Sequence, residues 1–250
     1  MPQDQQLRTL PSWQSDDGDP LHFCTTCAFS QASKSAGYDK AALRDLHVLV
    51  EHVGPFRRGD YVFRAGNSFR AIFAVRAGAV KTVAMDPDGN EHILGFYIPG
   101  EVIGLNAIYP EHYPCDAIAL EASLFCRFSF PAISALATRM PGLQQQLFKL
   151  ISKELGEANR LLGSQGADER VAAFLLNLAA RYAAQGSPPR QLRLAMSRND
   201  VAAHLHLASE TVSRTLTRFK DASLIDVSGR TITVLDPNRL SQLAQCILER

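Results

Sequence analysis

The chain has 250 residues, 46% of them hydrophobic, and its formal net charge at pH 7 is +1. This length fits one large or two ordinary domains with a substantial core. No run of 18 apolar residues occurs, and residues 1–20 lack the apolar stretch of a signal peptide, so we expect a soluble, cytoplasmic protein without a membrane partner. The charge is uneven: residues 166–250 carry 11 Lys and Arg against 8 Asp and Glu, net +3, which favours a polyanion as the partner of this part.

Residues 1–40 are predicted to be an N-terminal segment in which residues 1–20 are a flexible lead and a cysteine pair follows. Cys24 and Cys27 have two residues between them, a spacing that lets two thiolates bind one metal centre, although two incidental cysteines are the alternative. Five cysteines in a cytoplasmic chain favour free thiols or metal ligands over disulfides. Apolar spacing then predicts a helix from Asp39 to Val53.

Residues 41–139 are predicted to form a β-roll. From Phe56 to Phe130, short runs rich in Val, Ile, Phe and Ala alternate with turn residues, a pattern typical of an all-β roll or sandwich. Such a roll could also contain a cupin-type metal enzyme, but His92 and His112 are isolated, so we expect no enzyme. The predicted turns are Arg58-Gly59-Asp60, Gly66-Asn67, Ala77-Gly78, Asp86 to Gly89, and Pro99-Gly100.

Residues 140–165 are predicted to form one long helix with two apolar faces. Five positions step by 3, 4, 3 and 4, which is a heptad seam suited to a second copy of the chain. Burial within one monomer is the alternative. No seam position is acidic, and Glu154 and Glu157 are expected to point to solvent. The seam comprises Phe148, Ile151, Leu155, Ala158 and Leu162, and Leu143, Leu147, Leu150 and Leu161 flank it.

The remaining residues, 166–250, begin with a predicted helix from Ala167 to Ala184. Ser197 to Asp200 then has the form of a capping box and opens a short helix that closes near His206. A second short helix follows up to Phe219, with Ser209 as its N-cap. Two short helices joined by a tight turn predict a helix-turn-helix.

The second of these helices has the chemistry of a DNA-reading element. Val212, Leu216 and Phe219 form its buried stripe, and the opposite face carries an acceptor, a hydroxyl and two guanidinium groups, which can read base edges and hold phosphates. A solvated surface helix is the alternative. Residues 224–234 predict a hairpin with a turn at Ser228-Gly229 and Arg230 at its tip, so a winged DNA-binding domain is expected. The candidate DNA-binding residues are Ser209, Glu210, Ser213, Arg214, Arg218 and Arg230.

This order of parts resembles the CRP/FNR transcription regulators. The fold class that the resemblance implies is α+β, with an N-terminal β-roll of jelly-roll form, a long dimerisation helix and a C-terminal winged helix-turn-helix. Residues 56–67 resemble the first roll hairpin of the family, and residues 167–174 resemble the start of its DNA-binding domain. In Ser209 to Leu216, Glu210, Ser213 and Arg214 match the trio with which the FNR branch recognises TTGAT-like half-sites. The segment Glu111 to Asp116 lacks the Arg-Ser pair of cyclic-AMP receptors, so no cyclic nucleotide is expected.

The FNR branch senses oxygen through a [4Fe-4S] iron-sulfur cluster held by four cysteines. Cys24 and Cys27 match the first two ligands, and Cys126 matches the ligand from the roll. Ser33 stands where the family has its third cysteine, and a hydroxyl is a poorer iron ligand than a thiolate. Cys115, Ser33 or Asp39 could complete the set. Cys246 is expected to be a buried apolar residue.

The resemblance thus implies a homodimeric transcription activator that binds an inverted repeat in double-stranded DNA, contacts RNA polymerase and functions in anaerobic regulation. A cluster-independent regulator of the same fold, or one that responds to nitric oxide through haem, stays open, as does a β-roll module that binds protein instead of DNA. Because of Ser33 and the acid-free seam, we expect dimerisation and DNA binding to depend less on an intact cluster than in a typical FNR-type sensor. Ordinary oxygen sensing, restored by another ligand, remains the alternative.

Overall fold

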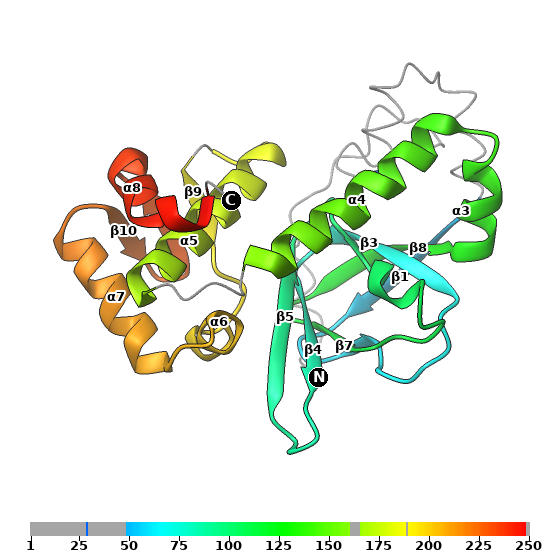
Figure 1. The fold of residues 1–250 in the computed structure, drawn as a ribbon, viewed down its shortest axis with the longest axis horizontal. Helices are drawn as coiled ribbons and strands as arrows, with labels where there is room; N and C mark the ends of the chain where they lie inside the picture. The colour runs from blue at the N-terminus through cyan, green and yellow to red at the C-terminus, as the bar shows by residue number, and fades with distance from the viewer. Residues whose placement is uncertain (1–28, 30–48, 161–165, 189, 249–250) are drawn as a thin grey trace, which may run out of the picture.

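The computed structural model describes residues 29, 49–160, 166–188 and 190–248, without the side chains of residues 158–160 and 245–248. The long helix α4 (Pro141–Arg160) lies across a β-roll, and a C-terminal helical unit lies beside the roll (Figure 1). This arrangement confirms the predicted fold class. Within the described residues, no helix is long and apolar enough to cross a bilayer.

The roll consists of two antiparallel four-stranded sheets. The first has the order β1-β8-β3-β6 and the second the order β2-β7-β4-β5. Tight turns join the strands at the predicted breaks, including Ala77-Gly78 between β3 and β4 and Asp86 to Gly89 between β4 and β5. The strands are β1 (Val50–Phe56), β2 (Tyr61–Phe63), β3 (Ala71–Ala77), β4 (Val80–Met85), β5 (Glu91–Tyr97), β6 (Val102–Ile103), β7 (Asp116–Ala119) and β8 (Ser123–Ser129).

Alternation along the strands fills two separate apolar layers. Side chains such as Val75, Val80 and Phe125 meet between the two sheets. The opposite face of the first sheet, with Cys126 and Phe128, packs against helices α3 (Phe130–Ala137) and α4. Because successive strand residues point to opposite faces, neighbours in β8 contribute to different layers.

Helix α4 has one buried and one exposed apolar face. Leu143 and Leu147 are buried against the roll, whereas Phe148, Ile151 and Leu155 are 62%, 40% and 64% exposed. The buried flanking residues Leu143 and Leu147 thus serve the monomer, and the described seam residues leave an apolar stripe uncovered.

The C-terminal unit is a helical domain with a small sheet. Helix α5 (Ala167–Ala184) has the bounds that the sequence predicts, and α6 (Arg198–Leu205) and α7 (Ser209–Asp221) form the helix-turn-helix. Strands β10 (Ile225–Ser228) and β11 (Thr231–Val234) form the wing hairpin, β9 (Gln191–Arg193) pairs with β11, and α8 (Pro237–Leu248) packs on α5.

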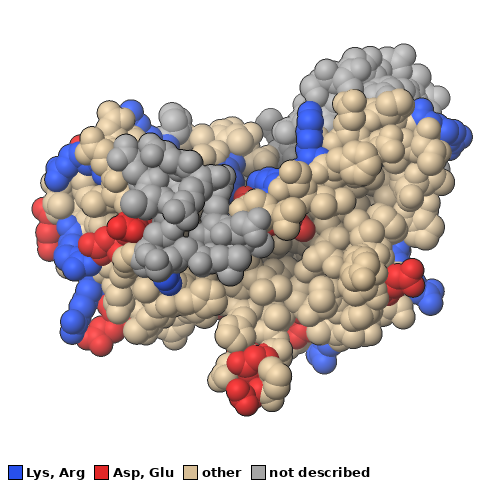
Figure 2. Space-filling view, in the orientation of Figure 1, with Lys and Arg blue, Asp and Glu red and all other residues tan. Residues whose placement is uncertain are grey.

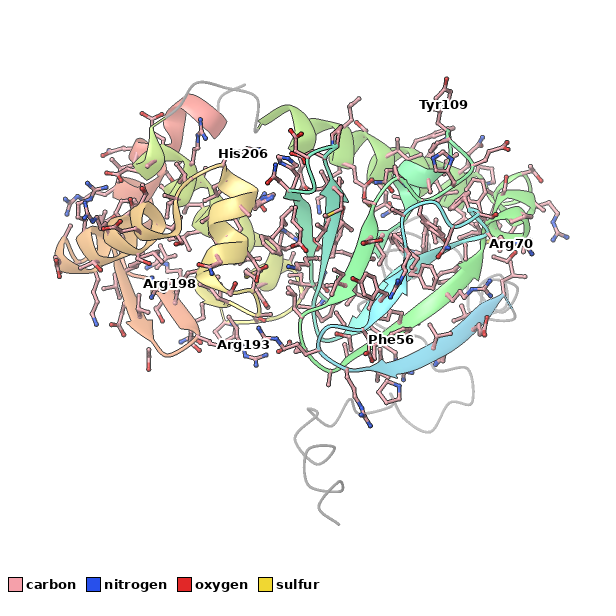
Figure 3. All side chains as sticks on the ribbon, turned by 90° about the horizontal axis from the view of Figure 1, so that it is seen from below. Phe56, Arg70, Tyr109, Arg193, Arg198 and His206 are labelled. Carbon is pink, nitrogen blue, oxygen red and sulfur yellow. The ribbon has the colours of Figure 1, made fainter. Side chains whose placement is uncertain are left out.

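A continuous apolar core joins this unit to the roll. Val83, Ile93 and Phe96 from β4 and β5 share one buried cluster with Val201 and Leu205 of α6. Figure 3 shows α6, between the labelled Arg198 and His206, lying alongside the β4–β5 hairpin. The position of the C-terminal unit is therefore fixed by side-chain packing on the roll.

Some local expectations are wrong. Val50 and Val53 lie in strand β1 and not in a helix. Ser209 is the first residue of α7, since Ala208 occupies the N-cap and makes no side-chain cap. Ser228 pairs with Thr231, which moves the hairpin turn one residue later, to Gly229-Arg230.

Candidate nucleic-acid interface

Capping chemistry fixes the geometry of the helix-turn-helix. The Ser197 hydroxyl accepts from the Asp200 amide at 3.1 Å, and the Asp200 carboxylate accepts from the Ser197 amide at 2.9 Å, which is the predicted capping box. At the other end, His206 adopts a left-handed conformation with φ of 53° and ends the helix. The chain can then turn sharply into α7.

Helix α7 has a buried side and an open side. Val212, Leu216 and Phe219 are at most 4% exposed, as predicted. On the open side, Glu210 and Arg214 form an ion pair of 2.5 Å while their side chains remain 72% and 75% exposed. Both groups can therefore exchange this partner for a base edge at little desolvation cost.

The other candidates on this surface differ in how firmly they are held. Arg218 forms an ion pair with Asp168 of α5 and also donates to the Thr215 hydroxyl at 3.0 Å. Thr215 is fully buried and itself donates to Asp168 at 2.9 Å. No local sequence pattern indicated that Asp168 holds α7 in this way, because Asp168 and Thr215 are 47 residues apart. Arg230 is exposed at the tip of the wing, and Figure 2 shows Lys and Arg side chains at this edge of the molecule, with Asp and Glu among them.

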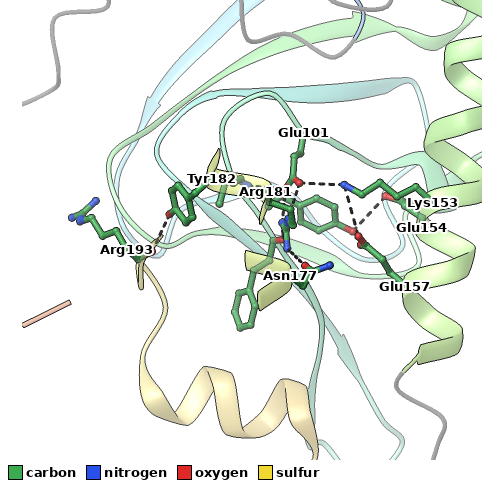
Figure 4. Close-up of polar contacts among 11 residues, drawn as sticks. Glu101, Lys153, Glu154, Glu157, Asn177, Arg181, Tyr182 and Arg193 are labelled. Carbon is green, nitrogen blue, oxygen red and sulfur yellow. Dashed lines mark hydrogen bonds and ion pairs between the residues drawn. The ribbon is translucent and has the colours of Figure 1, made fainter. Parts of the chain in front are cut away.

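Ion pairs connect the C-terminal unit to the roll around their apolar contact. Lys81 of β4 donates to Asp200 at 2.7 Å, and both side chains are about 15% exposed. Arg181 of α5 makes a bidentate pair with Glu101 at 2.8 and 2.5 Å (Figure 4). Asp200 thus both caps α6 and anchors it, so the start of the helix-turn-helix is tied directly to the roll.

The junction also contains perturbed titratable groups. Burial, together with the charge of Glu157, raises the pKa of Glu154 to about 7, and the Tyr97 hydroxyl donates to this carboxyl group at 3.4 Å (Figure 4). The expectation that Glu154 points to solvent is therefore wrong, because it faces β5. Burial lowers the pKa of His204, whose Nδ1 lies 3.0 Å from the Ile93 carbonyl oxygen.

The described cysteines of the roll lie in different layers. Cys126 belongs to the layer between the first sheet and α4. Phe29 is buried in the same layer and meets Phe128 edge-on, with ring centroids 5.1 Å apart. Cys115 lies between the two sheets, where Asn106 donates to its sulfur at 3.5 Å and burial raises the pKa of its thiol. The structure therefore does not bring Cys115 and Cys126 into one cluster.

Several candidate residues lie outside the described residues. They include Cys24, Cys27, Ser33, Asp39 and Leu162, and the side chains of Ala158 and Cys246 are likewise not described. Among the residues that the structure does describe, no group of three or more His, Cys, Asp or Glu side chains could hold a metal ion.

A β-roll fused to an exposed recognition helix and a wing defines the class of winged helix-turn-helix regulators. Comparison with known proteins supports the same class. The family model of the Crp-like helix-turn-helix domain matches residues 169–243, and that of the cyclic nucleotide-binding domain matches residues 54–139.

Individual similar proteins show to which family within this class the chain belongs. The transcriptional activator protein anr of Pseudomonas aeruginosa is 38% identical over 233 residues, which cover 92% of this chain and 96% of the relative. The fumarate and nitrate reduction regulatory protein of Escherichia coli K12 is 36% identical, over 88% and 90% of the two chains. The solved structure of FixK2 from Bradyrhizobium japonicum is similar with a TM-score of 0.70 and 27% identity, over 78% of this chain and 96% of that chain. The chain belongs to the FNR branch of the CRP/FNR family of DNA-binding transcription regulators, and it is not an enzyme.

Proposed function

We propose that this protein is a homodimeric transcription activator that reads an inverted repeat of TTGAT-like half-sites with helix α7. The observation that carries the proposal is the exposed Glu210–Arg214 pair on a helix whose other side is buried. Relatives named as transcriptional activators support the direction of regulation, which requires contact with RNA polymerase. We expect no binding of a cyclic nucleotide.

Each exposed group of α7 has a role that fits its chemistry. Arg214 would donate two hydrogen bonds to guanine, and Glu210 would accept from cytosine. Ser213 would contact a neighbouring base. Arg218, braced by Asp168, and Ser209 and Arg230 at the edges of the site would contact phosphates.

Substitution of Arg214 tests this assignment. Arg214→Ala should cost about 1–3 kcal/mol on the cognate site and relax the preference for guanine, because a bidentate contact is lost. Arg239→Ala, which removes an exposed arginine from α8, is the matched control for charge. If Arg214→Ala leaves the discrimination between cognate and scrambled half-sites unchanged, α7 does not read the site as proposed.

Dimerisation through α4 follows from its exposed seam. The stripe of Phe148, Ile151 and Leu155 faces away from the roll-packed Leu143, and a second copy would cover it. Ala158 and Leu162 would extend the same stripe. In a symmetric dimer, the two α7 helices would then contact half-sites about 34–36 Å apart.

We further propose that Cys24, Cys27 and Cys126 hold an iron-sulfur cluster. Burial of Phe29 beside Phe128 supports this, because Phe29 follows Cys27 by two residues and lies in the layer of Cys126. Thiolates are the usual ligands of such a cluster, and the bound cluster would supply an oxygen-sensitive group. The separate position of Cys115 between the sheets favours Ser33 or Asp39 as the remaining ligand.

A regulator that depends weakly on the cluster is the second candidate. One ground is Ser33, which stands at the place of a thiol ligand. The other is the seam, because buried like charges would hold two protomers apart and no seam position is acidic. The absorption spectrum of protein purified without oxygen distinguishes protein that binds an iron-sulfur cluster, protein that binds haem, and protein that binds neither group. Sedimentation and operator binding before and after exposure to air, repeated with Cys126→Ala, then decide between the candidates. Conversion of a DNA-binding dimer into a monomer by air or by Cys126→Ala would exclude cluster independence.

A further inference from the structure

A lysine stands on the face of the roll that supports the C-terminal unit. Lys81 of β4 is directly opposite Phe96 of β5 and Ile118 of β7. Residues directly opposite in antiparallel strands point to the same face of a sheet. Phe96 belongs to the apolar cluster that the roll shares with the C-terminal unit, and Ile118 packs against this cluster. Lys81 therefore brings a positive charge into the contact between the two units.

This lysine reaches the first helix of the helix-turn-helix. Its Nζ donates to Oδ1 of Asp200 at 2.7 Å, and the two side chains are 15% and 14% exposed. Arg181 and Arg193 instead connect α5 and β9 to carboxylates of the roll. The pair with Asp200 thus holds α6 itself, the helix that directly precedes α7.

The two oxygens of the Asp200 carboxylate have separate partners. Oδ2 accepts from the Ser197 amide at 2.9 Å and from its hydroxyl at 2.6 Å, whereas Oδ1 accepts from Lys81. The capping box does not include Lys81. Removal of the lysine charge therefore leaves the N-terminal cap of α6 in place and alters the contact of α6 with the roll.

The lysine charge favours the docked arrangement of α6. Burial alone would raise the pKa of Asp200, but the hydrogen bonds from Lys81 and Ser197 outweigh burial and lower it, so the carboxylate is charged. Without its partner, a nearly buried charge disfavours the structure that buries it by about a hundredfold. This cost applies only while α6 lies on the roll, because separation would return Asp200 to water. The pair thus holds the C-terminal unit in one position.

We propose that Lys81, acting through Asp200, is a positioning residue that fixes the distance between the two α7 helices of the dimer. Figure 3 shows α6 alongside the β4–β5 hairpin, and the same arrangement in both protomers would set where each α7 meets DNA. Lys81 thus determines how strictly the dimer selects the spacing of its half-sites. This inference rests on the proposed function, because it requires a dimer that reads two half-sites.

The test compares full-length wild type with Lys81→Met, Lys81→Arg, Glu91→Gln and the double variant Lys81→Met with Asp200→Asn. Glu91→Gln is the matched control, since this carboxylate lies 3.9 Å from Lys81 but is 59% exposed and belongs to the roll. Dissociation constants are measured without oxygen for an inverted repeat of TTGAT-like half-sites and for the same half-sites moved apart by half a helical turn. A duplex with a single half-site reports whether the helix-turn-helix still binds.

The variants should differ in how well they distinguish the two spacings. Wild type should prefer the first spacing about tenfold or more, whereas Lys81→Met should prefer it about threefold or less and bind the single half-site as wild type does. Lys81→Arg keeps a cation, and the double variant removes the unpaired charge, so both should recover most of the preference. Glu91→Gln should behave as wild type.

The outcomes separate this inference from the proposed function. If wild type prefers the first spacing and Lys81→Met prefers it equally, the role of Lys81 is refuted and the proposed function stands. An equal loss in Glu91→Gln, no recovery in the double variant, or failure of Lys81→Met to bind the single half-site also refutes that role, because the cause is then not the unpaired charge at the junction. If wild type binds both spacings equally, the proposed dimeric reading of DNA and this inference both fail.

Discussion

Arg181→Met tests how the DNA-binding unit is held on the roll. Arg181 pairs with Glu101 through two contacts, and its Nη2 also donates to the Phe96 carbonyl oxygen at 2.5 Å. The side chains of Arg181 and Glu101 are 16% and 11% exposed. Methionine is similarly long and uncharged, so the substitution leaves the Glu101 carboxylate in place without its main partner.

The expected cost follows from what remains around Glu101. Removing one partner of a buried ion pair costs about 3–5 kcal/mol, because the other charge is left uncompensated. Here Lys153 lies 3.3 Å from Oε1, and the Ile98 amide donates to Oε2 at 3.0 Å. We therefore expect the free energy of unfolding to fall by about 2–3 kcal/mol at pH 8.

The pH dependence of this cost has a definite sign. Burial alone would raise the pKa of Glu101, but the charge and hydrogen bonds of Arg181 outweigh burial and hold the pKa below its ordinary value. Without Arg181, burial raises this pKa above that of the unfolded chain, so stability is lost as pH rises through it. In wild type, the lowered pKa leaves the contribution of Glu101 unchanged between pH 5 and 8. The deficit of Arg181→Met should therefore be smaller at pH 5 than at pH 8.

Urea unfolding at both pH values measures this difference. The double variant Glu101→Gln with Arg181→Met should recover part of the loss at pH 8, because it removes the buried charge. The importance of the pair would be refuted if Arg181→Met lost the same free energy of unfolding at pH 5 and pH 8. It would also be refuted if the losses caused by Glu101→Gln and Arg181→Met simply added in the double variant.

Three further predictions concern the junction, the dimer and the DNA contact. Because burial raises the pKa of Glu154 to about 7, wild type should lose stability as pH rises from 6 to 8, and Glu154→Gln should abolish this loss, as measured by the melting temperature. Leu143→Ala should cost about 2–5 kcal/mol in urea unfolding, whereas Leu155→Ala should preserve the fold and weaken dimerisation in sedimentation, since only Leu143 is buried. Arg218→Ala should weaken binding to all DNA sequences alike and lower the slope of affinity against salt by about 1, and an effect limited to cognate DNA would contradict a phosphate contact.

Local chemistry made the helix-turn-helix predictable. The capping box of Ser197 and Asp200 and the buried stripe of α7 depend on residues within a few positions of each other, so their spacing in the sequence determines them. Val50 and Val53 show the opposite case. Their spacing also fits a helix, but pairing with β8 overrides it, and a break in the register follows Val53.

The contacts between the roll and the DNA-binding unit could not be predicted. Lys81 and Asp200 are far apart in the sequence, and no local pattern indicates that they meet at 2.7 Å. Glu154 was expected in solvent because it lies beside the seam and not in it, yet Tyr97 of β5 lies against it. The neighbours of Lys81 in the sheet likewise depend on strand register, which only the folded roll defines.

The most direct test of the proposed dimeric regulator is its binding to an inverted repeat of TTGAT-like half-sites, compared with the same half-sites moved apart by half a helical turn. The dissociation constant and the stoichiometry are measured without oxygen for wild type. If dimerisation through α4 fixes the distance between the two α7 helices, one dimer should bind the first site tightly. Moving the half-sites apart should lower the affinity at least tenfold, because the dimer can then read only one half-site. Equal affinities for the two spacings, or binding of one monomer per half-site, would contradict a symmetric dimer that reads DNA through α7.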